Sequence, residues 1–181
     1  MEATELGKKI EQLALDHGYS CVGYTTADKL RPTEDVRSMC AAGRCKSYDH
    51  SWACPPACGS VEEFAEKIAT YKECVVFQTV GDLEDEFDFE TMMETSEDHA
   101  DRMPDFADDV RELVPNCMVL AAGTCNLCKE CAYPDEPCRF PEKRFTSMEA
   151  SGLVVSDTCI AADIPYNHGS DHIAYVSCVL F

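Results

Sequence analysis

Residues 60–80, SVEEFAEKIATYKECVVFQTV, place a helix directly before a strand. Ser60 is a typical N-cap residue, and Glu63 stands three positions later, where its carboxylate completes a capping box. The following run at 74–80, CVVFQTV, is apolar and rich in β-branched residues, which is typical of a buried strand. One continuous stretch therefore predicts two elements of regular structure.

The same alternation continues toward the N-terminus. Apolar residues recur at helical spacing behind Thr4, a candidate cap, and Gly18 offers a stop for that helix. The β-branched run CVGYTT at 21–26 then predicts a strand. Helix and strand are thus expected to follow one another here as well.

Toward the C-terminus, CMVLAAG at 117–123 and HIAYVSCVLF at 172–181 predict two further strands. Residues 147–164, SMEASGLVVSDTCIAADI, predict a helix that is broken or frayed at Gly152. Because helices and strands alternate, we expect an α/β or α+β fold. It would be a single domain, residues 1–181, with a mixed β-sheet flanked by helices and two cysteine-rich metal-binding loops.

The segment at about 82–112 is strongly acidic, with 14 Asp and Glu against two Arg. Apolar side chains still punctuate it, so we expect one or two surface helices, broken near Pro104, with the acidic residues on the solvent face.

The whole chain has 34 Asp and Glu against 15 Lys and Arg, a formal charge of −19. This charge repels nucleic-acid phosphates and anionic membrane surfaces, and no apolar stretch approaches the roughly 18 residues of a membrane span. We therefore expect neither nucleic acid nor a membrane as a partner. An acidic surface suits a redox partner protein with a basic docking surface, although solubility is the simpler explanation.

Residues 1–20 carry charges throughout, instead of a basic stretch followed by an apolar run, which favours a cytoplasmic location. In that reducing compartment, grouped cysteines are typical of metal ligands or redox centres rather than of structural disulfides.

Eight of the 13 cysteines form two groups, one in each of two irregular segments, at about 29–60 and about 123–146. The first group has the spacing C-x4-C-x8-C-x3-C and consists of Cys40, Cys45, Cys54 and Cys58. The second has the spacing C-x2-C-x2-C-x6-C and consists of Cys125, Cys128, Cys131 and Cys138. These eight residues are the candidate metal and cofactor ligands.

Three cysteines at intervals of three can present three thiolates to three corners of an iron–sulfur cubane, as in bacterial ferredoxins. In that run the fourth cysteine precedes a proline, whereas Cys138 follows Pro137 and lies six residues beyond Cys131. Either Cys138 is the fourth ligand or the two groups exchange ligands. One or two [4Fe–4S] clusters are expected, with structural zinc bound by four thiolates as the alternative.

The first group contains the rigid sequence Cys54-Pro55-Pro56-Ala57-Cys58, with the chain's one tryptophan two residues before it. The prolines would fix the separation of the two thiols, and Trp52 would either screen a cluster or belong to the core. The remaining cysteines are expected to pack in the core, and they are Cys21, Cys74, Cys117, Cys159 and Cys178.

The histidines give weaker signals. His50 lies beside Asp49 in a polar loop, where a surface or supporting role is more typical than ligation. His168 and His172 stand four apart, but the glycine between them favours a turn.

Taken together, CAAGRCKSYDHSWACPPACGS, GTCNLCKECAYPDEPCRFPEKRFTSMEASGLVV and YVSCVLF resemble the predicted metal-binding protein family called domain of unknown function 2284. The resemblance spans nearly the whole chain. It implies metal binding at the eight grouped cysteines, through iron–sulfur chemistry, and implies no particular reaction.

Three functions remain open at this level. The first is a small electron-transfer protein with up to two [4Fe–4S] clusters. The second is a zinc- or cluster-stapled interaction module without a redox role. The third is a redox enzyme in which one cluster has an open iron site, because only three cysteines of one group bind it. Substrate and oligomeric state are not readable from the residues.

Overall fold

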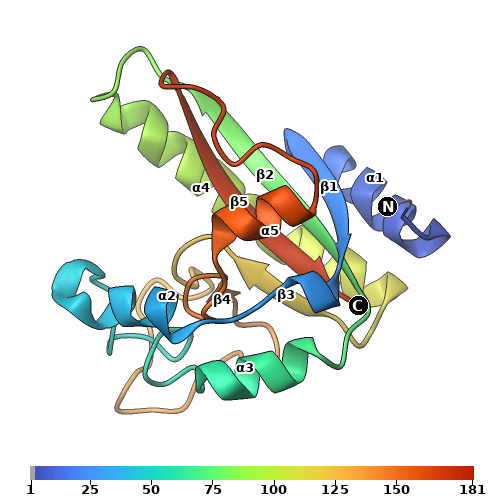
Figure 1. Cartoon of the computed structure of the whole chain (residues 1–181). Helices are drawn as coiled ribbons and strands as arrows, with labels where there is room; N and C mark the ends of the chain where they lie inside the picture. Colours follow the sequence, from blue (N-terminus) through green and yellow to red (C-terminus); the bar gives the residue numbers. More distant parts are fainter. Residues whose placement is uncertain (1–2) are drawn as a thin grey trace.

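The computed structural model describes residues 3–181, and a five-stranded mixed sheet lies at its centre (Figure 1). The strands are β1 (Cys21–Thr26), β2 (Glu73–Asp82), β3 (Met118–Ala121), β4 (Thr146–Ser147) and β5 (His172–Leu180). The helices are α1 (Glu5–Asp16), α2 (Glu34–Met39), α3 (Val61–Ile68), α4 (Phe89–Leu113) and α5 (Val155–Ala161). The predicted class, a mixed sheet flanked by helices, is therefore confirmed.

The strand order is β1-β2-β5-β3-β4, so that β5, the last strand in the chain, lies in the middle of the sheet. It pairs antiparallel with β2 along its length and with β3 on its other side. β3 and β4 are parallel. The N- and C-terminal parts of the chain are thus joined through β5.

Alternate residues of β2 point to opposite faces of the sheet and pack into two separate cores. Val75 and Phe77 pack with α1 and α4 on one face, whereas Cys74 and Val76 pack with α3 and α5 on the other. All four side chains are fully buried. Both faces are therefore covered, as Figure 1 shows for α4 and α5.

The predicted helix starts are confirmed by their caps. The Thr4 hydroxyl accepts a hydrogen bond from the Gly7 N–H at the start of α1. At α3, the Ser60 hydroxyl accepts from the Glu63 N–H, and the Glu63 carboxylate accepts from the Ser60 N–H. Local side-chain chemistry thus determines where both helices begin.

The acidic segment differs from its prediction, because α4 is a single helix that continues through Pro104. Residues before and after the proline lie on the same buried face of this helix, including His99, Met103 and Phe106. Burial of this face against the sheet holds the helix together where the proline removes a backbone hydrogen bond.

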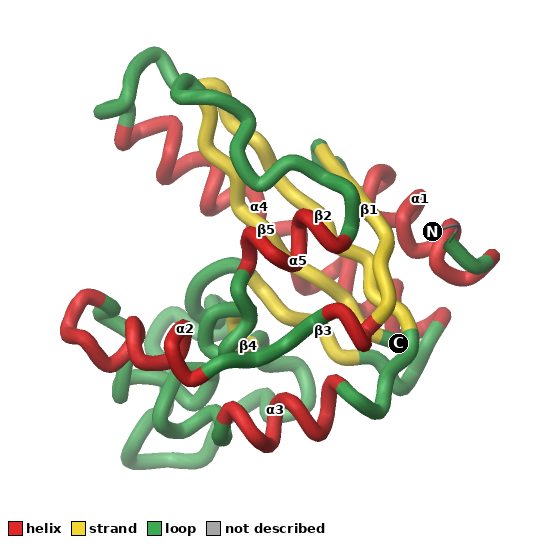
Figure 2. The backbone as a smooth tube through the Cα atoms, in the orientation of Figure 1, coloured by secondary structure: helices red, strands yellow, loops and turns green. Residues whose placement is uncertain are grey.

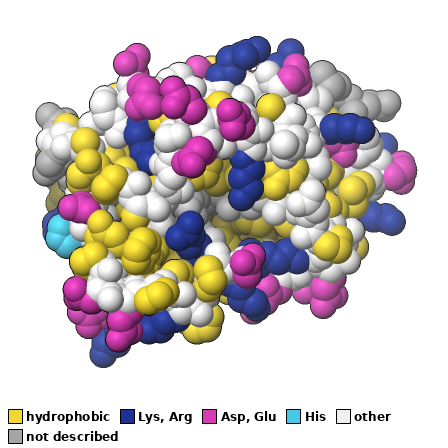
Figure 3. Space-filling model, turned by 90° about the horizontal axis from the view of Figure 1, so that it is seen from below, with side chains coloured by type: hydrophobic (Ala, Val, Ile, Leu, Met, Phe, Trp, Pro, Cys, Tyr) yellow, Lys and Arg dark blue, Asp and Glu magenta, His cyan; other side chains and the backbone are white. Residues whose placement is uncertain are grey.

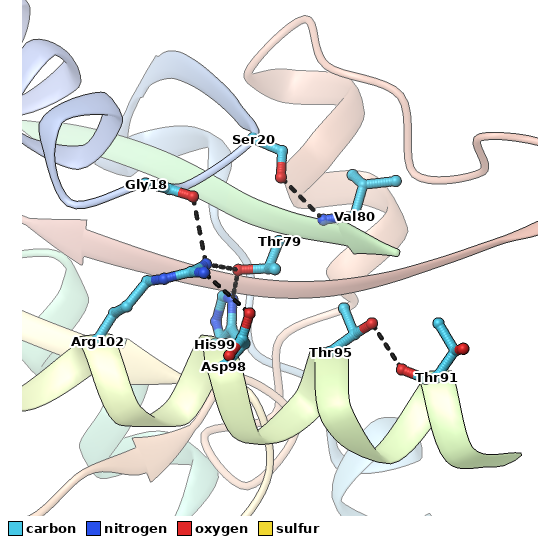
Figure 4. A network of polar contacts seen from close by, with 9 residues as sticks. All are labelled: Gly18, Ser20, Thr79, Val80, Thr91, Thr95, Asp98, His99 and Arg102. Carbon is cyan, nitrogen blue, oxygen red and sulfur yellow. Dashed lines mark hydrogen bonds and ion pairs between the residues drawn. The ribbon is translucent and has the colours of Figure 1, made fainter. Parts of the chain in front are cut away.

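A buried polar contact also ties α4 to the sheet (Figure 4). The ring of His99 is hydrogen-bonded to the hydroxyls of Thr79 on β2 and Ser177 on β5, at 2.9 and 2.7 Å. Arg102, one turn further on, donates to the Gly18 carbonyl and the Thr79 hydroxyl. These contacts fix the position of α4 along the sheet.

Two other predictions need correction. The helix predicted over 147–164 is limited to α5, because Gly152 has a φ of +91° and its carbonyl accepts a hydrogen bond from Thr33. The segment 29–60 is not wholly irregular, because it contains α2 and a short π-helix, Cys40–Arg44. Figure 2 shows that many of the loops gather beside α2, α3 and β4, away from α1, whereas others join β2 to α4 and α5 to β5. Within residues 3–181, no helix is both long and apolar enough to cross a membrane.

Candidate metal centres

The first cysteine group is assembled by two local turns. Cys40 begins the π-helix that follows α2. The Cys58 N–H donates to the Cys54 carbonyl at 3.0 Å, so a tight turn brings the two cysteines near each other. Cys54 and Cys58 are only 5 and 9% exposed, whereas Cys45 is exposed.

The four thiols of this group are neighbours. Burial raises the pKa of Cys54, and the thiols of Cys45 and Cys58 raise it further. Burial also raises the pKa of Cys40, with a further contribution from Cys45. Burial likewise raises the pKa of Cys58, and Cys40 adds to that effect. Four thiolates in this arrangement would repel one another unless a cation lay between them.

Arg37, on α2, brings a positive charge to this group. Its Nη2 lies 3.4 Å from the Cys58 Sγ and also donates to the Gly59 carbonyl. Its Nη1 is buried and has no hydrogen-bond partner among the described residues. A buried guanidinium nitrogen without an acceptor is costly, and a negatively charged group at the cysteines would satisfy it.

The second group is gathered around one cavity, of about 30 Å³. All four of its cysteines line this cavity, and Trp52, Leu127 and Phe140 provide the apolar wall. The other lining residues are Ser51, Ala53 and Arg144. Cys125, Cys128, Cys131 and Cys138 thus face a common space, and each of them is half-buried.

Hydrogen bonds at this cavity favour thiolates. Burial raises the pKa of Cys131, but hydrogen bonds outweigh it and the net pKa is lowered. The donors include the backbone N–H groups of Trp52 and Tyr133 and the Ser51 hydroxyl. Arg139 is hydrogen-bonded to Cys128, and this bond raises the pKa of the guanidinium. Cys131 is therefore favoured as a thiolate, the form in which cysteine binds a cation.

The two groups share one stretch of backbone. Ser51, Trp52 and Ala53 line the second cavity, and the next residue, Cys54, belongs to the first group. The Cys54 Sγ lies 3.7 Å from the Thr124 hydroxyl, next to Cys125. The two groups therefore lie side by side.

Trp52 serves the second group, although its position in the sequence suggested the first. Its indole N–H donates to the Glu136 carbonyl at 2.9 Å, and its ring meets Tyr133 edge-on at 4.9 Å between centroids. The sequence distance to Cys54 was thus misleading, because the loop reverses direction between the two residues.

The remaining cysteines belong to the core or its margin. Cys74, Cys159 and Cys178 are fully buried, whereas Cys21 and Cys117 are half-buried and pack against the cores.

The hydrogen-bond and ion-pair partners of His50, His168 and His172 are groups other than the grouped cysteines. The His50 ring is hydrogen-bonded to the Tyr48 carbonyl, and His168 to the side chain of Gln78. His172 pairs with Asp82 and Asp171.

Sequence reasoning missed the three arginines of the site. Arg139 directly follows Cys138, and Arg37 precedes Cys40 by three residues, so proximity in sequence was an available signal for both. Arg144 has no such signal, because the turn at 141–143 returns it to the cavity.

Across residues 3–181, no three Cys, His, Asp or Glu side chains stand close enough to hold one metal ion.

These features define a cysteine-rich protein of mixed α/β fold that holds two adjacent groups of four thiols. The chain belongs to the DUF2284 family, described as predicted metal-binding proteins, whose model matches residues 25–181. The family is thus described by predicted metal binding, and the two cysteine groups are the residues of this chain that could hold a metal.

The comparison with curated proteins gives no match. Among solved structures, the chain is similar to epoxyqueuosine reductase from Streptococcus thermophilus, with 12% identity and a TM-score of 0.44. The match covers 98% of this chain and 46% of the reductase. This chain therefore spans less than half the length of that protein, and we draw no functional argument from the likeness.

Proposed function

We propose that this is an iron–sulfur protein that transfers single electrons, with a [4Fe–4S] cluster at each cysteine group. The observation that carries the proposal is the second cavity, where four cysteines face one space behind an apolar wall. Thiolates are the usual protein ligands of such clusters.

The spacing of the second group along the chain supports a cluster over a single ion. Three cysteines at intervals of three can present three thiolates to three corners of an iron–sulfur cubane. When bound, the clusters would supply one-electron redox chemistry.

The protein's own residues would neutralise and orient the ligands. At the first group, Arg37 places one guanidinium nitrogen beside Cys58 and another, unpartnered, in the interior. At the second, Arg139 and the backbone N–H groups around Cys131 donate to sulfur. Such hydrogen bonds stabilise the more negative, reduced form of a cluster and so raise its reduction potential.

The shared segment 51–54 supports electron transfer between the two groups. One wall residue of the second cavity, Ala53, is bonded directly to a cysteine of the first group, Cys54. An electron entering at either cluster would therefore reach the other through a short path. Two clusters that serve only as staples would not need this adjacency.

We also propose that the electron donor or acceptor is a protein with a basic docking surface. The chain carries a charge of −19, and the acidic residues of α4 lie on its solvent face. A surface of this kind accelerates association with basic partners at low ionic strength.

Anaerobic purification followed by metal analysis tests the proposal. We expect brown protein with broad absorption at about 400 nm and about eight iron and eight sulfide per chain. A reversible one-electron couple should appear in an electrochemical titration. Colourless protein with stoichiometric zinc would overturn the proposal.

One observation favours a second candidate, a metal-stapled interaction module. The loops that carry the cysteines contain only α2 and a π-helix as regular structure, so bound metal would replace core packing there. Bound metal without any accessible redox couple would select this function.

A further inference from the structure

A groove of about 800 Å³ lies beside the first cysteine group. It lies between α3, the segment that leads from α4 into β3, and the loop that precedes β4. This volume is within the range of pockets that hold small organic ligands. Figure 3 shows the molecule from the side on which α3 lies, with Lys and Arg side chains around hollowed, partly apolar surface.

Three basic side chains line the groove, and two of them are available to a ligand. Arg111 is paired with Asp108 at 2.9 Å. No carboxylate of residues 3–181 forms an ion pair with Lys67 or Arg144. These three cations come from α3, α4 and the loop before β4, so the fold brings them together.

Two carboxylates also line the groove, those of Glu63 and Glu142. Glu63 accepts the Ser60 N–H at 2.6 Å at the start of α3, and Glu142 is exposed on the loop. The lining of the groove is therefore not acidic, in contrast to the chain as a whole with its formal charge of −19.

The rest of the lining suits a ligand that is also partly apolar. Phe64 and Met118 supply apolar surface, and Tyr71 and Asn116 supply hydrogen-bonding groups. Cavities that combine an apolar wall with a few placed polar groups are typical of sites for small organic molecules.

The groove reaches both cysteine groups. Cys58 of the first group is one of its lining residues. Arg144 lines the groove and also the cavity of the second group. A ligand held by Arg144 would therefore lie next to the first centre.

From these observations, we propose that the groove binds a small organic anion, a carboxylate or a phosphate on an apolar body, next to Cys58. Binding follows from the groove alone.

The test uses anaerobically purified full-length protein and the fluorescent probe anilinonaphthalene sulfonate, an aromatic anion. Phenylnaphthylamine, which has a similar ring system without the sulfonate, is the neutral control. We expect the anionic probe to bind at least about tenfold more tightly than its neutral analogue. The substitution Lys67→Gln should lower the affinity for the anionic probe about fivefold. Lys72→Gln, which removes an exposed charge just outside the groove, should leave affinity unchanged.

Arg144→Gln should lower the affinity for the anionic probe more than Lys67→Gln does. Arg144→Lys, which keeps the positive charge, should recover part of the lost affinity. Benzoate and phenyl phosphate, added as competitors, distinguish a carboxylate site from a phosphate site. Equal affinity for both probes, or equal effects of Lys67→Gln and Lys72→Gln, would overturn the groove proposal.

Iron analysis of the same samples separates this proposal from the proposed function. If the protein contains iron but binds both probes equally, the proposal of an anion site in the groove is wrong and the proposed function is unaffected. If the protein lacks iron but binds the anionic probe selectively, the proposed electron-transfer function is wrong and the proposal of an anion site is unaffected.

Discussion

The indole N–H of Trp52 donates a hydrogen bond to the carbonyl oxygen of Glu136, 84 residues further along the chain. This bond joins the two cysteine loops directly. The ring of Tyr133 packs against the same indole, and its hydroxyl donates to Asp49 on the first loop. The two loops are therefore fastened to each other and not only to the sheet.

Trp52→Phe removes this hydrogen bond and leaves an aromatic ring in the wall of the second cavity. We expect anaerobic protein to keep its full iron content but to lose iron several-fold faster in air, because the wall opens more readily. The loss is followed by bleaching of the brown colour. Tyr166→Phe, at an exposed position far from both groups in sequence, is the control and should bleach at the wild-type rate.

Substitution of cysteine by serine should divide the cysteines into two classes. Cys128→Ser should lose or convert a cluster, because it removes a ligand from the second cavity. Cys74→Ser should keep the metal and cost about 1–2 kcal/mol, because it places a hydroxyl in a fully buried apolar site. Iron content and thermal melting measure the two effects. Retention of all iron by Cys128→Ser together with iron loss by Cys74→Ser would contradict the assignment.

Arg37→Gln should lower the reduction potential of the first centre. The substitution removes a positive charge 3.4 Å from the Cys58 Sγ, and this charge stabilises the reduced form more than the oxidised form. A shift of about 60 mV is expected, the equivalent of a tenfold change for one electron. Potentiometric titration measures it, with the exposed Arg31→Gln as control. An unchanged or higher potential would rule out this role.

His99 should make stability depend on pH. Burial, with a smaller contribution from Arg102, lowers its pKa to about 3, whereas an unfolded histidine titrates at about 6.5. Between these values the unfolded state binds more protons, so the free energy of unfolding falls as the pH falls. The limiting slope for this one group is about 1.4 kcal/mol per pH unit.

His99→Gln should therefore flatten the dependence of melting temperature on pH from about pH 7 to about pH 5. The exposed His50→Gln is the control and should keep the wild-type slope. An identical slope in His99→Gln and wild type would mean that His99 is not held neutral in the folded state.

Gly23→Ala should destabilise the protein by about 1–3 kcal/mol, because it overfills a packed site. A Cβ at this position in β1 would clash with the carbonyl of Ala162 and lie 2.6 Å from the Ile164 Cγ2. Gly123→Ala meets no atom within 4 Å, so only its φ of +72° opposes the new side chain. Chemical denaturation should therefore show the larger loss for Gly23→Ala, and the opposite order would refute the packing argument.

The helices and strands that could be predicted have their structural signals within their own sequences. Ser60 and Glu63 cap α3 without help from the rest of the chain, and the strand that follows is apolar on both faces. The path of α4 through Pro104 was not predictable in this way, because it depends on burial against strands distant in sequence. Tertiary packing keeps α4 helical at Pro104, although proline disfavours the interior of a helix.

Part of the candidate site was likewise predictable from local sequence, and part was not. The cysteine spacing indicated two groups, and the structure brings each group together. The wall of the second cavity was not predictable, since Trp52 and Arg144 reach it only through the folding of two loops. Spacing reports ligands that are close in sequence, whereas the residues that surround them are selected by the fold.

The central place of β5 has a consequence for the order of assembly during synthesis. Every other strand and both cysteine loops emerge from the ribosome before β5 does, yet β5 joins β2 to β3. Until it pairs, the hairpin-like unit of β1 and β2 and the unit of β3 and β4 have no common sheet. The first cysteine loop lies between β1 and β2 and the second between β3 and β4, so the pairing of β5 is the step that places both loops on one sheet.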